Sequence, residues 1–454
     1  MTHTLPLSQW LGNTRADATL IAWLGDNTWT QARLRYDVAL LLSQLNNHPG
    51  ERWALCFENS YLFIVALLAT LCARKIPVIP GHSRVALLKE QCVFFDGILS
   101  DKPLSWPENL LVVSSSGEAT ITQQPPLPII DDDQFLELFT SGSTGQPKRV
   151  VKRIATLDQE ARILAARFAP QMTDCRVVAS VVPQHLYGLT FRIVLPMALG
   201  LPLHAAMLYY AEQLTALNPQ YRYVFISSPA FLKRLDNQLP APQVAMTFSA
   251  GGMLPWHDVQ YTRDWLGQTV DEIYGSTETG ILAWRHREQD QQAWVPFPGV
   301  YFAHQAEKYI AHSPLIDNPS GLILDDMLAL NDDGSFQLSG RRGRVVKIEE
   351  KRVSLTEVEQ RLLELDGVKD AAVIPVSRGG RQGIGALLVL DEEHGSLWCS
   401  SNKKTLEFAW RQALLPWLEP VAIPRYWRVI QEIPVNSMNK RVYGQLQELF
   451  HETS

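Results

Sequence analysis

The sequence predicts an α/β protein with a large amino-terminal domain of mostly parallel sheets flanked by helices and a smaller α+β carboxyl-terminal domain. Short apolar, strand-like runs alternate with helical segments over the amino-terminal part, an order typical of parallel sheets. From about Gly343 the pattern changes to a smaller mixed unit. The chain has 454 residues, 46% of them hydrophobic, which is enough for two or three cores. We therefore expect domains at residues 1–342 and 343–454.

The expected elements follow from local periodicity and composition. Residues 29–45 have the apolar spacing of a helix. Residues 52–57 and 76–80 are strand-like and enclose an apolar helix that starts near Leu62, which gives a strand–helix–strand order. Further expected elements are strands 176–182, 221–226, 244–249, 272–274, 345–348, 371–375 and 384–390, and helices 194–201, 355–365 and 404–415.

Composition argues against several classes of protein. The net charge of -6 and the lack of a long Lys/Arg stripe disfavour nucleic-acid binding. The start, MTHTLPLSQW, lacks the basic and apolar regions of a secretory signal. The longest apolar run, Leu62–Ala73, has about 12 residues, too few to span a bilayer. The scattered cysteines fit reduced thiols of a cytoplasmic protein; they are Cys56, Cys72, Cys92, Cys175 and Cys399.

The most informative stretch is residues 138–148, which read LFTSGSTGQPK. Glycines let a loop turn its backbone N–H groups toward an anion, hydroxyls add hydrogen bonds and a lysine adds positive charge. Lys148 follows Pro147 and precedes Arg149, so the loop lacks the Walker A order, and a P-loop kinase or GTPase is not expected. A Ser/Gly-rich surface linker is the alternative. The candidate phosphate-binding residues are Thr140, Ser141, Gly142, Ser143, Thr144, Gly145 and Lys148.

A second polar turn, residues 274–280, reads YGSTETG and follows a short strand. It places the carboxylate of Glu278 among hydroxyls and glycines at a strand end, which is where α/β sheets bind ligands. The alternative is a solvated surface turn.

Together, the loop and the turn resemble motifs of the acyl-adenylate-forming enzymes, which include acyl- and aryl-CoA synthetases, adenylation domains of nonribosomal peptide synthetases, and luciferases. The resemblance extends from about Trp29 to Leu446. It implies that a carboxylate attacks the α-phosphate of Mg·ATP, giving an acyl adenylate and pyrophosphate. A phosphopantetheine thiol then displaces AMP after the small, mobile domain has rotated. ATP and Mg²⁺ are the implied cofactors.

The resemblance also implies roles for individual residues. Thr277 would contact the α-phosphate and the acyl carbonyl, and Glu278 would bind Mg²⁺, which needs few protein carboxylates beside phosphates. Lys440 would bridge the substrate carboxylate and the α-phosphate, offsetting the repulsion between two anions. Asp326 would bind the ribose, with Asp325 as the alternative. Other implied nucleotide contacts are Gly251, Tyr274, Gly275, Ser276 and Arg341, and the implied hinge is Gly343.

The resemblance places the acid-binding residues in two further segments. Residues 183–189, PQHLYGL, follow a predicted strand, and His185 would gate the carboxylate. A hydrogen-bonded structural histidine is the alternative. No aspartate stands where amino-acid-activating domains bind the α-amine, which favours a plain aryl or acyl acid. The implied acyl-pocket residues are Tyr187, Phe191, Ser249 and Gly252, with Gly251 beside them.

Three positions depart from the family pattern. Gly343 replaces an Asp or Lys hinge, Glu350 replaces a glycine on the thiol path, and Asn439 replaces a glycine before Lys440. Glycine and asparagine permit unusual backbone angles, so the hinge and the lysine turn can survive. The charged Glu350 instead disfavours the usual CoA tunnel.

The compact amino-terminal domain and Glu350 on the thiol path make a holo-acyl carrier protein the expected acceptor. The chain also looks like the ligases of bacterial aryl polyene clusters, which load a hydroxybenzoyl-type starter on such a carrier. Free CoA is the nearer alternative acceptor. A non-catalytic nucleotide-binding relative is the more distant alternative, since the three departures weaken the motif match.

Overall fold

The computed structural model describes residues 4–106, 109–115, 126–141, 147–305, 308–341, 344–348, 351–378, 381–399, 403–418, 420–435 and 441–451. The chain forms two compact units, the first of Met1–Val300 and His312–Ser320, the second of Tyr301–Ala311 and Gly321–Ser454. The predicted boundary at residue 342 depends on a hinge at Gly343, which lies outside the described residues, so it stays a prediction. No helix within the described ranges is long and apolar enough to cross a bilayer.

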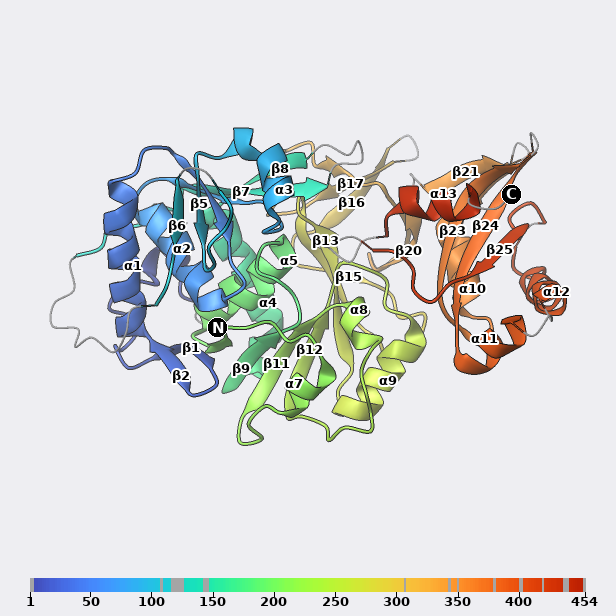
Figure 1. The fold of residues 1–454 in the computed structure, drawn as a ribbon, viewed down its shortest axis with the longest axis horizontal. Helices are drawn as coiled ribbons and strands as arrows, with labels where there is room; N and C mark the ends of the chain where they lie inside the picture. Colours follow the sequence, from blue (N-terminus) through green and yellow to red (C-terminus); the bar gives the residue numbers. More distant parts are fainter. Residues whose placement is uncertain are drawn as a thin grey trace. The chain divides into compact units, whose positions relative to one another are not determined.

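The first unit contains a large, mostly parallel sheet (Figure 1). Within the described ranges it has nine strands. The six central strands pair with one another in parallel, and the outer strands pair in antiparallel fashion. The order is β15 (Val295–Pro296), β14 (Gly280–His286), β13 (Val270–Ser276), β12 (Val244–Ser249), β11 (Arg222–Ser227), β9 (Cys175–Ala179), β10 (Leu203–His204), β1 (Leu20–Leu24) and β2 (Asn27–Thr30).

A second sheet of the first unit has six strands in the part of the chain that the structure describes. Its strands are parallel except for the β7–β8 hairpin. The order is β6 (Leu110–Val112), β5 (Gly97–Ser100), β3 (Arg52–Cys56), β4 (Ile76–Ile79), β7 (Phe135–Ser141) and β8 (Pro147–Arg153).

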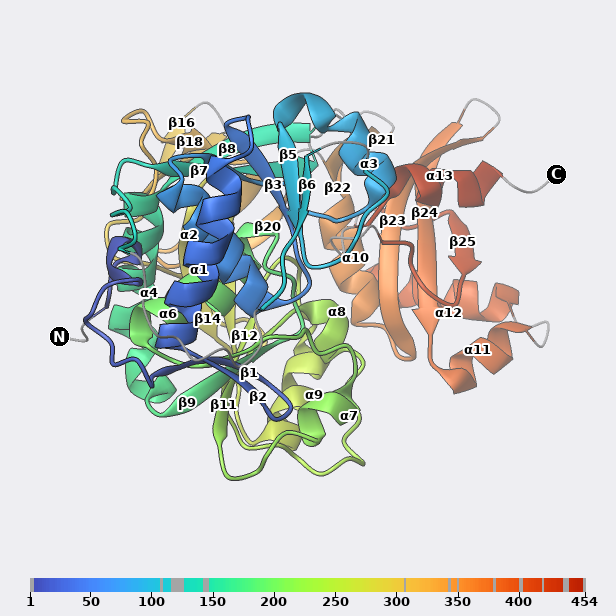
Figure 2. The ribbon, with the colours of Figure 1, turned by 60° about the vertical axis from the view of Figure 1, so that its left-hand side comes forward.

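Helices cover both sheets. The amphipathic α4 (Ile154–Met172) contacts β8 of the smaller sheet and β12 of the larger one, so it joins the two layers. The apolar α2 (Ser60–Cys72) is buried along its whole length between β3, β4 and α1 (Gln31–Asn46), and both ribbon views show α1 beside α2 (Figures 1 and 2). The side chain of Thr30 caps α1 and that of Asn59 caps α2, each by accepting a hydrogen bond from a backbone N–H group.

The outer face of the larger sheet packs against three short helices. Apolar residues of β11, β12 and β13 share a core there with α7 (Ala211–Thr215), α8 (Pro229–Leu232) and α9 (Trp256–Leu266). The remaining helical segments of this unit are η1 (Leu7–Gln9), α3 (Val85–Glu90), η2 (Cys92–Phe94), α5 (Leu186–Gly188), the π-helical η3 (Leu189–Val194) and α6 (Leu195–Leu199).

The second unit is α+β. Its β23 (Val368–Arg378) and β24 (Arg381–Leu390) pair antiparallel, and β25 (Tyr426–Val429) adds in parallel. One core joins this sheet to α10 (Leu355–Leu363), α11 (Glu392–Cys399) and α12 (Lys403–Leu414), and another joins it to α13 (Tyr443–His451). Smaller sheets contain β16 (Tyr301–Gln305), β17 (Lys308–His312), β18 (Leu322–Ile323), β19 (Asp326–Leu330), β20 (Phe336–Arg341), β21 (Val345–Ile348) and β22 (Lys351–Ser354).

The structure confirms the predicted fold class, a mostly parallel α/β unit followed by a smaller α+β unit. The bounds of one expected helix need correction. The helix expected at 194–201 is present as the shorter α6, which directly follows the π-helical η3 and is capped by Gly200 in a left-handed conformation. The helix α4, which was not among the expected elements, directly follows the hairpin of the candidate phosphate loop.

Candidate active site

The candidate site lies at the edge of the larger sheet where its parallel strands end. β10 lies on one side of β9 and β11 on the other, so the chain reverses its direction across the sheet there. Ligands of α/β sheets bind outside the carboxyl ends of the strands at such a switch point. Three predicted segments lie at the ends of β9, β12 and β13, namely residues 185–191, 249–252 and 274–278.

The turn at residues 277–279 joins β13 to β14 as a tight hairpin. A Cβ atom on Gly275 would lie 2.2 Å from the carbonyl oxygen of Gly280, so glycine is required. The N–H of Ser276 donates to Thr279 Oγ1 at 3.0 Å, and the N–H of Thr279 donates to Ser276 Oγ at 3.2 Å. The small and hydroxylated residues of this motif therefore determine the shape of the turn.

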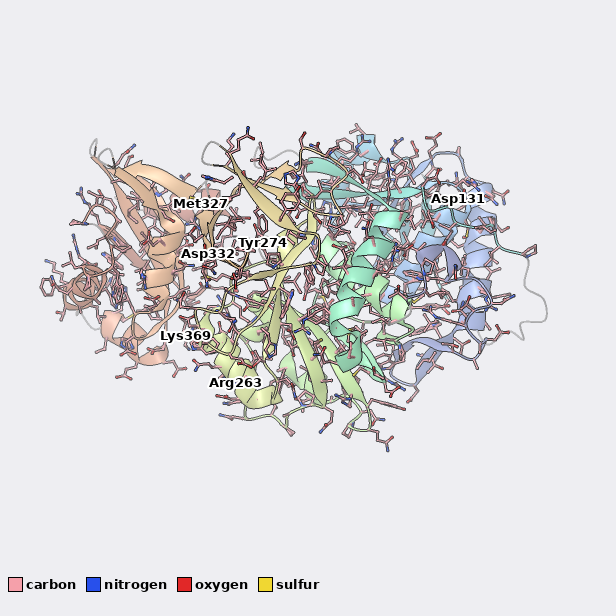
Figure 3. All side chains as sticks on the ribbon, turned by 180° about the vertical axis from the view of Figure 1, so that it is seen from behind. Asp131, Arg263, Tyr274, Met327, Asp332 and Lys369 are labelled. Atoms are coloured by element: carbon pink, nitrogen blue, oxygen red, sulfur yellow. The ribbon has the colours of Figure 1, made fainter. Side chains whose placement is uncertain are left out.

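Tyr274 lies near the end of β13 (Figure 3). Its ring lies 5.8 Å from the ring of Trp294. Thr277 lies in the turn itself, partly exposed. These positions place both residues at the strand end expected for a nucleotide site. Their individual contacts with a nucleotide stay predictions.

Lys148 and Glu278 come from distant parts of the sequence and meet at this edge. Lys148 Nζ lies 3.1 Å from Glu278 Oε1, and their side chains are 60% and 31% exposed. Lys148 also pairs with Thr140 across the β7–β8 hairpin. The hairpin tip, residues 142–146, and the side chain of Ser141 lie outside the described residues, so their phosphate contacts stay predictions.

The charge of Glu278 suits a cation site. Burial raises the pKa of this carboxyl group. Its own backbone N–H, Lys148 and Ser276 together lower the pKa by more than burial raises it, so the pKa lies below its ordinary value. A partly exposed, ionised carboxylate fits Mg²⁺, which takes one or two protein carboxylates when phosphates and water complete its shell. Among the residues that the structure describes, no three His, Cys, Asp or Glu side chains form a metal cluster.

Two buried charged residues that the sequence analysis did not single out contact the hairpin of Glu278. Lys152 of β8 donates from Nζ to the carbonyl oxygen of Glu278 at 3.0 Å, and burial lowers its pKa. Glu160 of α4 accepts from the N–H of Ile281 at 2.9 Å and from the hydroxyl of Thr190 at 2.7 Å, and burial raises its pKa. A sequence signal for Glu160 is its place within the apolar stripe of α4.

The segment of the predicted gate is also well anchored. His185 directly precedes α5, and Gly188 permits a close turn there because a Cβ atom would lie 1.9 Å from the carbonyl oxygen of Val182. The fully buried guanidinium of Arg192 donates to the carbonyl of Val181 at 2.6 Å. Burial lowers the pKa of Arg192 to about 9. The loop that carries His185 is therefore fixed by backbone contacts, whereas gating stays a prediction.

The predicted acyl-pocket residues are brought together in part. The rings of Tyr187 and Phe191 lie 5.0 Å apart, and Phe191 lies 5.0 Å from Phe248 of β12. Ser249 follows directly and is buried at the end of that strand. Gly251 and Gly252 are exposed just beyond it, Gly251 with a φ of +88°. The aromatic pair and the strand end adjoin each other, and their role in acid binding stays a prediction.

The second unit carries the remaining predicted residues. Asp326 of β19 and Arg341 of β20 are cross-strand partners, so the strand register brings two predicted nucleotide contacts together. Asp325 precedes the strand and is exposed, whereas Asp326 is partly buried. Four further positions lie outside the described residues: Gly343, Glu350, Asn439 and Lys440.

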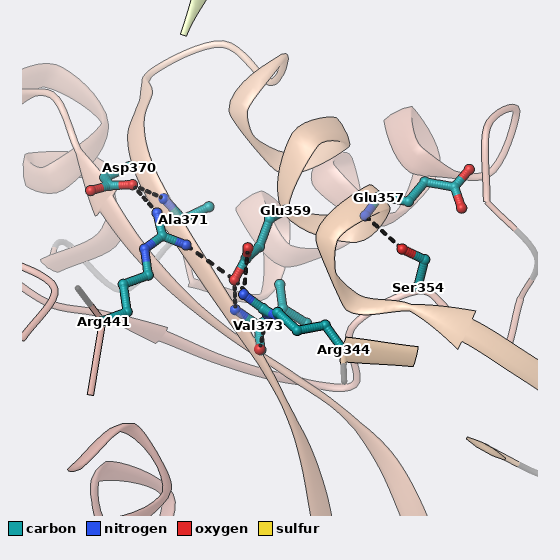
Figure 4. Close-up of polar contacts among 8 residues, drawn as sticks. All are labelled: Arg344, Ser354, Glu357, Glu359, Asp370, Ala371, Val373 and Arg441. Atoms are coloured by element: carbon teal, nitrogen blue, oxygen red, sulfur yellow. Dashed lines mark hydrogen bonds and ion pairs between the residues drawn. The ribbon is translucent and has the colours of Figure 1, made fainter. Parts of the chain in front are cut away.

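Arg441, the residue after the predicted catalytic lysine, is bound by two carboxylates of its own unit (Figure 4). Its Nη1 lies 3.1 Å from Glu359 Oε1, and its Nη2 donates to Asp370 Oδ1 at 2.7 Å. Glu359 also accepts from Arg344 Nη2 at 2.8 Å and from the N–H of Val373 at 2.7 Å. These contacts attach the chain at Arg441 to α10 and β23.

Comparison with known proteins decides the family. Residues 82–311 match the family of AMP-binding enzymes, a span that includes both Lys148 and Glu278. The chain belongs to this family. It is 30% identical over 247 residues to a 4-coumarate–CoA ligase of Cereibacter sphaeroides, a match that spans 52% of this chain and 55% of that ligase. It is 29% identical over 322 residues to a 4-coumarate–CoA ligase of Halorhodospira halophila, spanning 67% and 74%.

Solved structures share the fold of this AMP-binding enzyme over nearly its whole length. ATP-bound MatB from Rhodopseudomonas palustris superposes with a TM-score of 0.78 at 18% identity, covering 99% of both chains. A benzoate CoA ligase from Burkholderia xenovorans gives 0.76 at 20% identity, covering 98% of this chain and all of that one. At these identities the likeness establishes the fold alone.

Proposed function

We propose that this AMP-binding enzyme activates a carboxylic acid with ATP as an acyl adenylate and then transfers the acyl group to a thiol. The observation that carries the proposal is the 3.1 Å contact between Lys148 and Glu278 at the carboxyl ends of the parallel strands. It joins the predicted phosphate loop to the predicted magnesium ligand. The loop of His185 follows β9 at the same edge, which supports the proposal that the acid binds there.

The residues of the chain have distinct parts in this reaction. Lys148 and the hairpin amides bind the phosphates of ATP, and Glu278 offers a carboxylate to Mg²⁺, which would supply positive charge beside the phosphates when bound. The carboxylate of the acid attacks the α-phosphorus, the bond to pyrophosphate breaks, and AMP becomes the leaving group of the acyl adenylate. Lys440 offsets the repulsion between the two anions during this attack.

ATP–pyrophosphate exchange across a panel of benzoic, cinnamic and fatty acids tests the first half-reaction. We expect exchange with one class of acid and its loss in Lys440→Ala. Exchange by the original enzyme that disappears in Lys440→Ala would exclude a non-catalytic nucleotide-binding role, because such a protein would not form an adenylate at all. Binding of ATP without exchange for any acid would contradict the proposal.

For the acid, we propose an aryl substrate of the hydroxybenzoate type. The aromatic pair Tyr187–Phe191 beside the end of β12 supports an aryl ring, since aromatic side chains pack well against one another. The names of the two relatives, both 4-coumarate–CoA ligases, also support an aryl acid. Preference for fatty acids over benzoic and cinnamic acids would contradict this choice.

For the acceptor, we propose the phosphopantetheine thiol of an acyl carrier protein, motivated by Glu350 at the position where the family has a glycine on the thiol path. Free CoA is the second candidate, and the CoA ligases among the relatives favour it. Presenting CoA and holo-carrier protein side by side distinguishes them. Ready formation of acyl-CoA with an unmodified holo-carrier would contradict the carrier proposal.

A further inference from the structure

We propose that Lys152 and Glu160 are positioning residues that orient the turn of Glu278 for the binding of Mg²⁺ and phosphates. The inference rests on the proposed function. Neither residue belongs to the motifs by which the sequence was interpreted.

Two lysines on one strand contact the same residue. Side chains four positions apart on a strand lie on the same face, and Lys148 and Lys152 of β8 both face Glu278. Lys148 Nζ contacts its carboxylate at 3.1 Å, while Lys152 Nζ donates to its backbone carbonyl at 3.0 Å. Lys148 is largely exposed, whereas Lys152 is 5% exposed. The exposed lysine can therefore exchange partners while the buried one fixes the main chain.

Glu160 fixes the other side of the same hairpin. Its Oε1 accepts the N–H of Ile281, which lies three residues after Glu278, at 2.9 Å. Its Oε2 accepts the hydroxyl of Thr190 in η3 at 2.7 Å. A Cβ atom on Gly280 would lie 2.9 Å from Glu160 Oε1, so the carboxylate is packed directly against the hairpin backbone.

The opposite charges of Lys152 and Glu160 support each other. Each side chain is buried, and the charge of each favours ionisation of the other. A buried charge is tolerated when it is hydrogen-bonded, and a nearby opposite charge offsets part of the remaining cost of burial. The hairpin backbone is thus held at Glu278 and at Ile281 by two buried side chains of opposite charge, which is a way to fix the direction of a metal ligand.

The variant Lys152→Met keeps the length and apolar stem of the side chain but removes its donor. We expect the half-saturating Mg²⁺ concentration and the KM for ATP in pyrophosphate exchange to rise about tenfold, with the KM for the acid little changed. Lys152→Arg, which keeps a charged donor, should bring the half-saturating Mg²⁺ concentration and the KM for ATP most of the way back to those of the original enzyme. Hydrogen–deuterium exchange of residues 276–282 should become faster in Lys152→Met, a readout that needs no activity.

Lys75→Met is the matched control. Lys75 Nζ also donates to backbone carbonyls, those of His48 and Gly50, at 3.0 and 2.5 Å, but it directly precedes β4 and binds the segment that follows α1. We expect this variant to change stability without changing the Mg²⁺ dependence. If Lys152→Met behaves like Lys75→Met in both readouts, the positioning role is wrong. If the unmodified enzyme shows no pyrophosphate exchange, the proposed function fails, and hydrogen exchange alone decides the positioning role.

Discussion

Each unit contains a buried glutamate on a helix that fixes a neighbouring segment, but the partners of the two glutamates differ. Glu160 of α4 accepts from a threonine hydroxyl and a backbone N–H. Glu359 of α10 accepts from a backbone N–H and from two arginines, Arg344 and Arg441. Glu160 fixes the hairpin of Glu278, whereas Glu359 fixes the residue after the predicted catalytic lysine.

These two glutamates, each of which anchors a neighbouring segment, are expected to respond differently to loss of their charge. A hydroxyl can donate or accept, so the partners of Glu160 can adapt to a neutral side chain. A guanidinium only donates, so both oxygens of Glu359 must remain acceptors. The first anchor depends mainly on hydrogen-bond geometry, and the second depends on charge.

The largest effect is expected for Glu359→Gln. Its amide would direct N–H groups at Arg344 or Arg441 and leave these partly buried guanidinium groups short of negative charge. We expect a loss of about 3 kcal/mol in the free energy of unfolding, measured by urea denaturation. Hydrogen exchange should localise the change to residues 368–378. The control is Glu364→Ala, which removes the exposed Arg361–Glu364 pair and should cost less than about 0.5 kcal/mol.

An intermediate effect is expected at Asp158, another buried carboxylate of α4. It accepts the N–H of Leu7 at 2.9 Å, and burial raises its pKa from 3.8 to about 6. Because the folded state binds this proton more tightly than the unfolded state, stability contributed by the group is present below pH 4 and lost as the pH rises to 6.

The variant Asp158→Asn should remove that part of the pH dependence. We expect the difference in unfolding free energy between the variant and the original chain to change by about 2 kcal/mol from pH 4 to pH 7, in favour of the variant at pH 7. Urea denaturation at several pH values measures this. A parallel pH profile for both chains would show that Asp158 has an ordinary pKa.

The smallest effect is expected for Glu160→Gln. The amide oxygen can accept from Ile281, and the amide nitrogen can donate to the hydroxyl of Thr190, so both hydrogen bonds survive. We expect a loss of about 1 kcal/mol in the free energy of unfolding, because the attraction between Glu160 and Lys152 is lost. A loss as large as that of Glu359→Gln in the same urea experiment would remove the distinction between the two anchors.

The sequence identified much of the site because its chemistry lies in contiguous segments. The order of glycines, hydroxyls and Lys148 in one loop, and of Gly275 and Glu278 in one turn, predicted two strand ends that lie together in the structure. The segments around Gly343 and Lys440 lie outside the described residues, so their predicted roles rest on the sequence resemblance.

By itself, the sequence determined the fold class, the alternation of strands and helices, and the residues of the two main motifs, since these depend on local pattern and composition. Only the tertiary structure decided which charged side chains are buried and what they contact. Lys152 and Glu278 are separated by 126 residues, and Asp370 and Arg441 by 71. Such contacts depend on how distant segments pack, and burial then lowers the pKa of Lys152 and raises the pKa of Glu160 in a way that no local pattern encodes.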